Sequence, residues 1–209
     1  MKKRELILNS ASKKFKDKGF ANTTISTIAK DANIGKGTIY EYFSSKEDLL
    51  MHCCIGNCHA VEARIDSLVS TLDEANSNPV KIIYTTLHTV LSEFFAKGVE
   101  DNRLFYELSL LIATNPEVKT IVSKEFRVKL AHWQSLALAD YQRGLDEGYF
   151  RKINKPNDLA CFIVATIDGL IWQMQWADEE ELKTRPKRMA SMYLTLIMNE
   201  PDRLEDLIK

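Results

Sequence analysis

The sequence predicts an all-α fold of about nine helices, with a small N-terminal domain of three short helices followed by a larger helical domain. Only 8 Gly and 5 Pro occur in 209 residues, so few helix breakers interrupt the chain. Apolar residues recur three or four positions apart, which is the period of an α-helix with one buried face. No segment carries a convincing strand pattern.

The first helix is predicted over residues 4–18. Leu6, Ile7, Ala11 and Phe15 recur at helical spacing along it. Gly19 follows a basic last turn and is expected to end the helix.

The second helix is predicted over residues 25–32, where four apolar residues occupy positions i, i+3, i+4 and i+7. Thr24 before it offers an N-cap hydroxyl. Asn33 after it can adopt the left-handed conformation that ends many helices.

A third short helix is predicted over residues 35–43, with Ile39 and Phe43 buried. Three short helices with a tight turn between the second and third form a helix-turn-helix module. Ser44 with Glu47 fits a capping box that would open the next helix. The third helix would expose four side chains: Lys36, Thr38, Tyr40 and Tyr42.

Beyond this module the chain is predicted to be helical almost throughout, with a polar break over residues 73–78. Pro79, Pro116 and Pro156 each suit the first turn of a helix. The predicted helices cover residues 45–72, 79–97, 102–113, 116–147, a very apolar segment that begins at 156, and 184–199.

Charge is distributed unevenly along the chain. Residues 1–46 carry ten Lys and Arg against four Asp and Glu, whereas the remainder carries 18 against 25. A basic head on an acidic body is expected of a phosphate-binding module joined to a domain that does not bind DNA. Chance unevenness is the alternative interpretation.

Nothing in the sequence predicts a membrane segment. No stretch approaches the roughly 18 uninterrupted apolar residues of a membrane span. The basic N-terminus leads into an amphipathic pattern and lacks the apolar core of a signal peptide. We therefore expect a cytoplasmic protein with no membrane partner.

About 45 residues of the helix-turn-helix carry a distinctive pattern: Gly19-Phe20, Thr24-Ile25, Ile28-Ala29, Ala32-Asn33-Ile34, Gly37-Thr38-Ile39-Tyr40, Tyr42-Phe43 and Lys46-Glu47-Asp48-Leu49. This pattern resembles the TetR family of bacterial transcriptional regulators. Asn33 replaces the usual Gly of the turn and Gly35 the usual Ser or Thr cap, and both are suited to those positions. Outside this segment the chain resembles the family only in helix count and in the Ala160…Asp168-Gly169-Leu170 stretch.

The resemblance implies that the third helix enters the major groove of operator DNA. Lys36 would contact guanine or a phosphate, while Ser26 is too short to replace the base-reading arginine of some relatives. Tyr40 and Tyr42 would bind phosphates, or else serve only in packing. The implied DNA-binding residues are Thr24, Ser26, Lys36, Gly37, Thr38, Tyr40, Tyr42 and Lys46.

The resemblance further implies a DNA-binding domain over residues 1–47 and an effector-binding and dimerisation domain over residues 48–209. The protein would be a repressor that binds a palindromic operator as a homodimer and is released when an effector moves the helix after the module. The expected dimer interface, with an internal helix crossing as the alternative, comprises Phe162, Ile163, Thr166, Gly169, Leu170 and Gln173.

The effector is expected to be a small apolar or aromatic molecule, because the middle and late helices are rich in aromatic residues. An aromatic stripe at helical spacing is also typical of an ordinary core, so both interpretations stay open. The candidate effector-binding residues are Phe94, Phe105, Tyr106, Phe126, Trp133, Tyr141 and Trp172.

A cluster of His52, Cys53, Cys54, Cys58 and His59 admits a separate hypothesis. Cys54 and Cys58 lie one helical turn apart and could bind zinc or copper(I), or become oxidised. Buried cysteines that act as small hydrophobic residues are the alternative.

No pattern for catalysis or for a cofactor is present. The Gly35-Lys36-Gly37-Thr38 segment lacks P-loop spacing, and no Glu-x-x-His pair of a di-iron bundle occurs. We therefore expect neither an enzyme nor a cofactor. The remaining alternative function is a helical protein-interaction adaptor that does not bind DNA.

Overall fold

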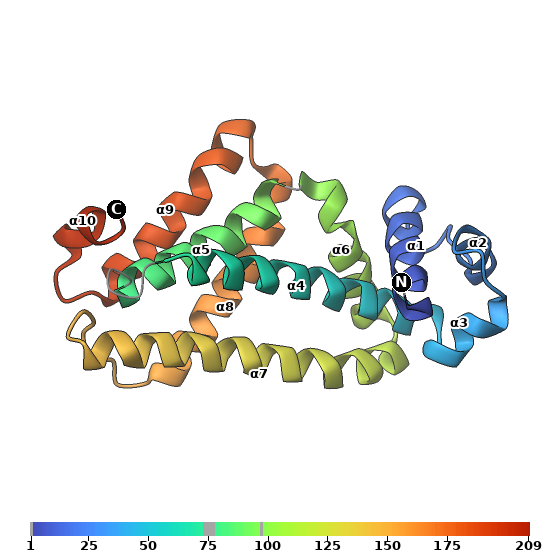
Figure 1. The fold of residues 1–209 in the computed structure, drawn as a ribbon, viewed down its shortest axis with the longest axis horizontal. Helices are drawn as coiled ribbons and strands as arrows, with labels where there is room; N and C mark the ends of the chain where they lie inside the picture. Colours follow the sequence, from blue (N-terminus) through green and yellow to red (C-terminus); the bar gives the residue numbers. More distant parts are fainter. Residues whose placement is uncertain (1, 73–77, 97) are drawn as a thin grey trace. The chain divides into compact units, whose positions relative to one another are not determined.

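The computed structural model describes residues 2–72, 78–96 and 98–209. It confirms the all-α fold and contains ten α-helices within these residues (Figure 1). Single 3₁₀ turns follow α8 and α9. The helices are α1 (Lys3–Lys18), α2 (Ile25–Asp31), α3 (Lys36–Tyr42), α4 (Lys46–Ser70), α5 (Pro79–Ala96), α6 (Gly98–Thr114), α7 (Pro116–Asp146), α8 (Pro156–Gln173), α9 (Glu179–Ile197) and α10 (Leu204–Leu207).

The start of α9 differs from the prediction of residue 184. Asp178 caps the helix: its carboxylate accepts a hydrogen bond from the Glu181 amide at 2.8 Å, and Glu181 accepts one from the Asp178 amide at 3.3 Å. Pro186 lies inside the helix. Here the cap determines the helix start, although a proline lies further on.

The start of α4 is also shifted, by one residue, so the predicted pairing of Ser44 with Glu47 is wrong. Ser45 Oγ instead accepts a hydrogen bond from the Asp48 amide at 3.0 Å. The Asp48 carboxylate accepts from the Ser44 amide at 2.7 Å and from its hydroxyl at 2.9 Å. The same capping chemistry therefore operates one position further along the chain.

The connections around α5 and α6 lie partly outside the described residues. The predicted break over 73–78 is described only at Asn78, whose side chain caps α5 by accepting from the Lys81 amide at 2.9 Å. Lys97, the predicted end of the fifth helix, is likewise outside the described residues. Helix α6 begins at Gly98, four residues before its predicted start.

The chain forms two compact units, residues 1–60 with 99–127 and residues 61–98 with 128–209. Helices α4 and α7 each contribute to both units. The predicted border at residues 47 and 48 concerns function, and it stays a prediction, because α4 runs through this position without interruption.

The core of the first unit is built where α1, α2 and α3 meet. Ile7, Phe15, Ile28, Ile39 and Phe43 are at most 1% exposed. Each such side chain contributes about 1.5–3 kcal/mol by leaving water. The same cluster continues into α4, α6 and the start of α7 through Leu49, Leu50, Leu104, Leu108, Val118 and Val122.

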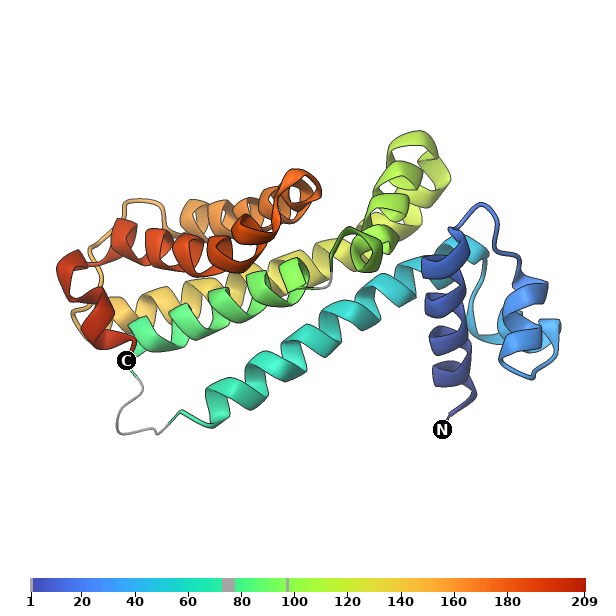
Figure 2. The same cartoon turned by 90° about the horizontal axis from the view of Figure 1, so that it is seen from above.

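The second unit packs α9 along α5, with α8 beside them (Figure 2). Tyr141 of α7 lies in its core, where its hydroxyl donates to the Arg151 carbonyl at 2.8 Å and accepts from the Ile153 amide at 2.9 Å. An isolated β-bridge between Phe150 and Met198 joins the loop after α7 to the end of α9.

Candidate DNA-binding interface

The turn between α2 and α3 adopts the predicted conformation. Asn33 has φ 53°, within the left-handed region, and the Ile34 amide donates to the Ala29 carbonyl at 3.0 Å. At the other end of α2, the Thr24 hydroxyl accepts from the Thr27 amide at 3.2 Å. Both ends of this seven-residue helix are therefore fixed by local hydrogen bonds.

Helix α3 separates a buried side from a polar side. Ile39 on α3 and Phe43 at its C-terminal end enter the core, whereas Tyr40 is 50% and Tyr42 43% exposed. Lys36 and Gly37 are exposed and Thr38 is half-buried. Polar side chains on a short helix that is anchored from behind can enter the major groove of DNA.

Thr24 and Ser26 extend this exposed surface along α2. The hydroxyl and the backbone amide of Thr24 both serve the helix cap, so its methyl group is the part of the side chain that adds to this surface. Neither side chain has the length of the arginine that some family members place at position 26.

Lys46 is one of the predicted DNA-binding residues. Its contacts within the chain were not indicated by the sequence. It is half-buried, and its ammonium group donates to the carbonyl oxygens of Phe20 at 2.9 Å and Thr23 at 3.0 Å. The same nitrogen lies 4.0 Å from the centre of the Phe20 ring. Two of its three N–H donors are therefore used within the chain.

An ion pair joins α1 to α2 within the helix-turn-helix. Lys14 Nζ lies 2.5 Å from one carboxylate oxygen of Asp31, and Ser10 donates to the other at 2.8 Å. The hydrogen bonds from Lys14 and Ser10 hold the pKa of Asp31 below its usual value. Because the pKa is lowered in the folded state, this contribution to stability is present above about pH 4 and is lost as the pH falls further.

The candidate effector-binding residues are distributed over both compact units. Phe105 and Phe126 pack against the core of the first unit. Tyr106 lies in the same unit. In the second unit, Tyr141 is buried, and Trp172 is 51% exposed with its ring centre 6.0 Å from that of Trp176. Phe94 and Trp133 are half-buried there.

Trp133 takes part in a polar cluster that joins α4 to α7. Its indole N–H donates to Glu62 Oε1 at 2.7 Å, and Lys129 Nζ lies 2.8 Å from the same oxygen. Glu62 therefore carries two contacts from α7, one neutral and one charged. Part of the attachment of α4 within the second unit depends on this carboxylate.

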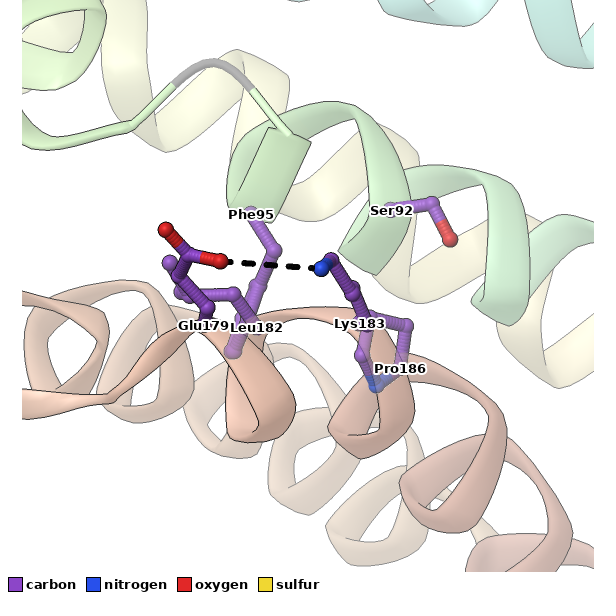
Figure 3. Close-up of a pocket in the computed structure, with 6 residues that line it drawn as sticks. All are labelled: Ser92, Phe95, Glu179, Leu182, Lys183 and Pro186. Atoms are coloured by element: carbon purple, nitrogen blue, oxygen red, sulfur yellow. Dashed lines mark ion pairs between the residues drawn. The ribbon is translucent and has the colours of Figure 1, made fainter.

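A pocket of about 350 Å³ lies between α5 and α9 (Figure 3). Phe95, Leu182 and Pro186 contribute apolar surface, and the Glu179–Lys183 pair, 3.7 Å apart, lies beside them. Ser92 completes the lining. No candidate effector-binding residue lines this pocket.

The six residues predicted for the dimer interface divide into two groups. Ile163 and Leu170 are buried within the core of the second unit, whereas Phe162 is 56% exposed. Thr166 and Gly169 are half-buried and Gln173 is exposed. Phe162 and Trp172 of α8, with Trp176 in the 3₁₀ turn that follows, are exposed large apolar side chains, and we call this part of the helix the α8 stripe.

Among the described residues, the segment Pro156–Trp176 is long and apolar enough to cross a membrane by length and composition alone. Its mean hydropathy is 1.3, and 22% of it is buried. A single helix of this kind is weak evidence for a membrane. Phe162, Trp172 and Trp176 are more than half exposed on this segment.

The cysteine cluster lies in an apolar environment. Cys53, Cys54 and Cys58 are all buried, and Cys161 is exposed. Burial raises the pKa of Cys53 to about 12 and also raises that of Cys54. Within the described residues, no group of three or more His, Cys, Asp or Glu side chains could hold a metal ion.

Residues 7–53 match the family model described as bacterial regulatory proteins, tetR family. Over 207 residues the chain is 23% identical to the HTH-type transcriptional regulator YfiR of Bacillus subtilis (strain 168), covering 97% of this chain and 95% of that protein. The match and the exposed third helix define a helix-turn-helix DNA-binding transcriptional regulator.

Solved structures extend the likeness to the whole fold. A TetR transcription regulator from Haloarcula marismortui superimposes with TM-score 0.69 at 21% identity, covering 94% of this chain and 98% of that chain. RolR in complex with resorcinol gives TM-score 0.61 at 20% identity, covering 99% and 93%. The N-terminal segment thus matches the TetR family, and the fold of the whole chain is similar to that of TetR-family regulators.

The burial of the thiols predicts a simple labelling pattern. In the native protein, Cys161 should react rapidly with a thiol reagent at pH 8, because it is exposed. Cys53 and Cys54 should react only after unfolding, since their raised pKa values leave almost no thiolate. Mass-spectrometric mapping of the modified peptides, with a Cys161→Ser control, measures this. Rapid native labelling at Cys54 would contradict the assignment and revive the redox hypothesis.

Proposed function

We propose that this regulator is a ligand-responsive repressor that binds a palindromic operator as a homodimer and is released by a small apolar or aromatic effector. The observation that carries the proposal is the exposed polar face of α3, held by the buried Ile39 and Phe43. One helix of seven residues contacts few bases, so two copies on a palindrome supply the affinity that a single copy lacks.

On the DNA, we assign direct reading of bases to Lys36 and Thr38, with Gly37 allowing close approach of the backbone. Tyr40 and Tyr42 project from the same helix and suit hydrogen bonds to phosphates, which fix the register of the protein on the duplex. Thr24 and Ser26 border this surface, and the proposed functional domain ends at residue 47.

For the dimer, we assign the exposed stripe of α8. Phe162 and Trp172 are large apolar side chains that are more than half exposed, and such surface is normally covered by a partner. Thr166, Gly169 and Gln173 lie along the same side of the helix. The buried Ile163 and Leu170 support the stripe from within each copy.

The effector would act on α4 through the polar cluster around Trp133. A ligand that accepts a hydrogen bond from the Trp133 indole N–H, or donates one to the Glu62 carboxylate, would compete with a contact between α4 and α7. Differential binding to two states of α4 is all that a population shift requires. The resorcinol bound by RolR is an example of a small aromatic ligand on a related fold.

The relatives and the family are transcriptional regulators, and we extend this to a non-enzymatic, cytoplasmic role for the chain itself. A protein-interaction adaptor would share the fold and lack the dependence on nucleic acid. Retention of the purified protein on duplex DNA, lost as salt is raised, separates the two functions.

Substitution of Lys36 tests the recognition surface. Lys36→Ala should relax preference at one base pair and cost about 1–3 kcal/mol of discrimination. Selection from a random-sequence duplex library, followed by titration, measures both effects. The control is Lys183→Ala, which removes the same charge from α9. Unchanged affinity and preference in Lys36→Ala would remove this residue from the interface.

Substitution on the α8 stripe tests the dimer. A charge buried at an apolar interface without a partner is strongly unfavourable. Phe162→Glu combined with Trp172→Glu should therefore give a monomer in sedimentation experiments at micromolar concentration. Leu110→Glu, at an exposed position on α6, should leave the dimer intact. A wild-type protein that sediments as a monomer would contradict the proposal.

Indole fluorescence tests the effector site. Titration of the protein with phenols and fatty acids that release the selected duplex should quench Trp133. The quenching should vanish in Trp133→Phe and persist in Trp176→Phe, which alters a side chain that is largely exposed. Quenching that disappears with Trp176 would place the ligand elsewhere.

A further inference from the structure

Two later helices hold one residue of the turn that connects α1 to α2, Phe20. Its N–H donates to Glu107 Oε2 of α6 at 2.7 Å. Its carbonyl oxygen accepts from Lys46 Nζ of α4 at 2.9 Å. Two helices that follow the DNA-binding module in the chain therefore hold the two sides of one residue in it.

On the α6 side, the Glu107 carboxylate is itself held in place by a neighbouring side chain. The second oxygen of Glu107 accepts from Arg103 Nε at 3.1 Å, and Arg103 Nη1 donates to the Lys16 carbonyl at 3.4 Å. Gly19, at φ +80°, lies against this guanidinium, so a Cβ there would displace the end of the Arg103 side chain. The backbone conformation itself favours glycine at this position.

The α4 side uses a charged donor. Lys46 Nζ also donates to the Thr23 carbonyl at 3.0 Å and lies over the Phe20 ring. Hydrogen bonds with an ionised partner are about twice as strong as neutral ones. The ammonium group therefore joins both ends of the short Phe20–Thr23 segment to α4.

The held segment leads directly into α2. Thr23 is buried, and its hydroxyl is within hydrogen-bond distance of the Lys14 and Gly19 carbonyls at 3.0 and 2.8 Å. Thr24, the next residue, caps α2. A displacement of Phe20 is therefore transmitted through one tight turn to the helix that supports α3.

We propose that Glu107 and Lys46 are positioning residues for DNA binding, which clamp Phe20 and so set the placement of α2 and α3. Helix α6 thereby provides a connection to the DNA-binding helices in addition to α4. This inference rests on the proposed function, because it concerns the geometry with which that surface meets an operator. It assigns Lys46, one of the DNA-binding residues that the family resemblance implies, a role within the chain in place of a contact with DNA.

Three variants test the clamp in the full-length protein. Glu107→Ala removes the acceptor of the Phe20 amide, whereas Glu107→Gln keeps an acceptor and loses the charge that pairs with Arg103. Lys46→Met removes the ammonium group and keeps the apolar stem. The control is Glu147→Ala, which breaks the Arg143–Glu147 pair, also with i,i+4 spacing, in the second unit.

The probes are a duplex selected by the wild-type protein from a random-sequence library and an unrelated duplex of equal length. Glu107→Ala and Lys46→Met should bind the selected duplex about tenfold more weakly, the loss expected for one strong hydrogen bond. Binding to the unrelated duplex and the salt dependence of binding should match wild type. Amide exchange over residues 20–31 should accelerate, and Glu107→Gln should fall between wild type and Glu107→Ala.

Distinct results overturn the proposal. A salt dependence that flattens by roughly one unit in Lys46→Met would make this residue a phosphate contact. Faster exchange with unchanged affinity in all three variants would make the clamp purely structural. If Glu107→Ala or Lys46→Met fails to fold by circular dichroism, Glu107→Gln decides, since wild-type exchange and affinity in that variant contradict the intermediate effect expected above and overturn the positioning role of Glu107. A wild-type protein that selects no duplex removes the proposed function as well.

Discussion

The structure depends on the burial of a few side chains behind two helices that are too short to be stable alone. A helix of seven residues gains too few hydrogen bonds to offset the cost of its nucleation. Ile28 of α2 and Ile39 of α3, with Phe43, supply the missing free energy by entering one core with α1. The outward direction of the polar side chains on α3 follows from this burial, since the two sides of a helix are fixed relative to each other.

The same core extends beyond the DNA-binding module, because α4, α6 and the start of α7 contribute to it. The smallest compact unit that contains the recognition helix therefore includes parts of the chain as far as residue 127. Polar contacts supplement this apolar core, because Glu107 and Lys46 form hydrogen bonds with the backbone of Phe20. Apolar burial supplies stability, while the directional hydrogen bonds fix position.

Features determined by near neighbours were predictable from the sequence. Asn33 at the turn and the inward Ile39 and Phe43 follow from spacing over a few residues. With two adjacent serines the cap of α4 was assigned to the wrong one. The contact of Glu107 with Phe20 spans 87 residues, and no local pattern indicates it. The roles of Tyr141 and Trp133 were equally inaccessible, because an aromatic residue at helical spacing suits a core, a ligand site or a polar cluster.

Gly37 lies inside α3, where a glycine lowers the stability of the helix. Glycine inside a helix costs about 0.8–1.0 kcal/mol relative to alanine. Around position 37, no described atom lies within 4 Å of where a side chain would begin, and φ is ordinary. Neither sterics nor backbone geometry within the protein accounts for that penalty. Under the proposed function, this open position lets DNA approach the backbone of α3, so stability and recognition would impose opposite preferences on one residue.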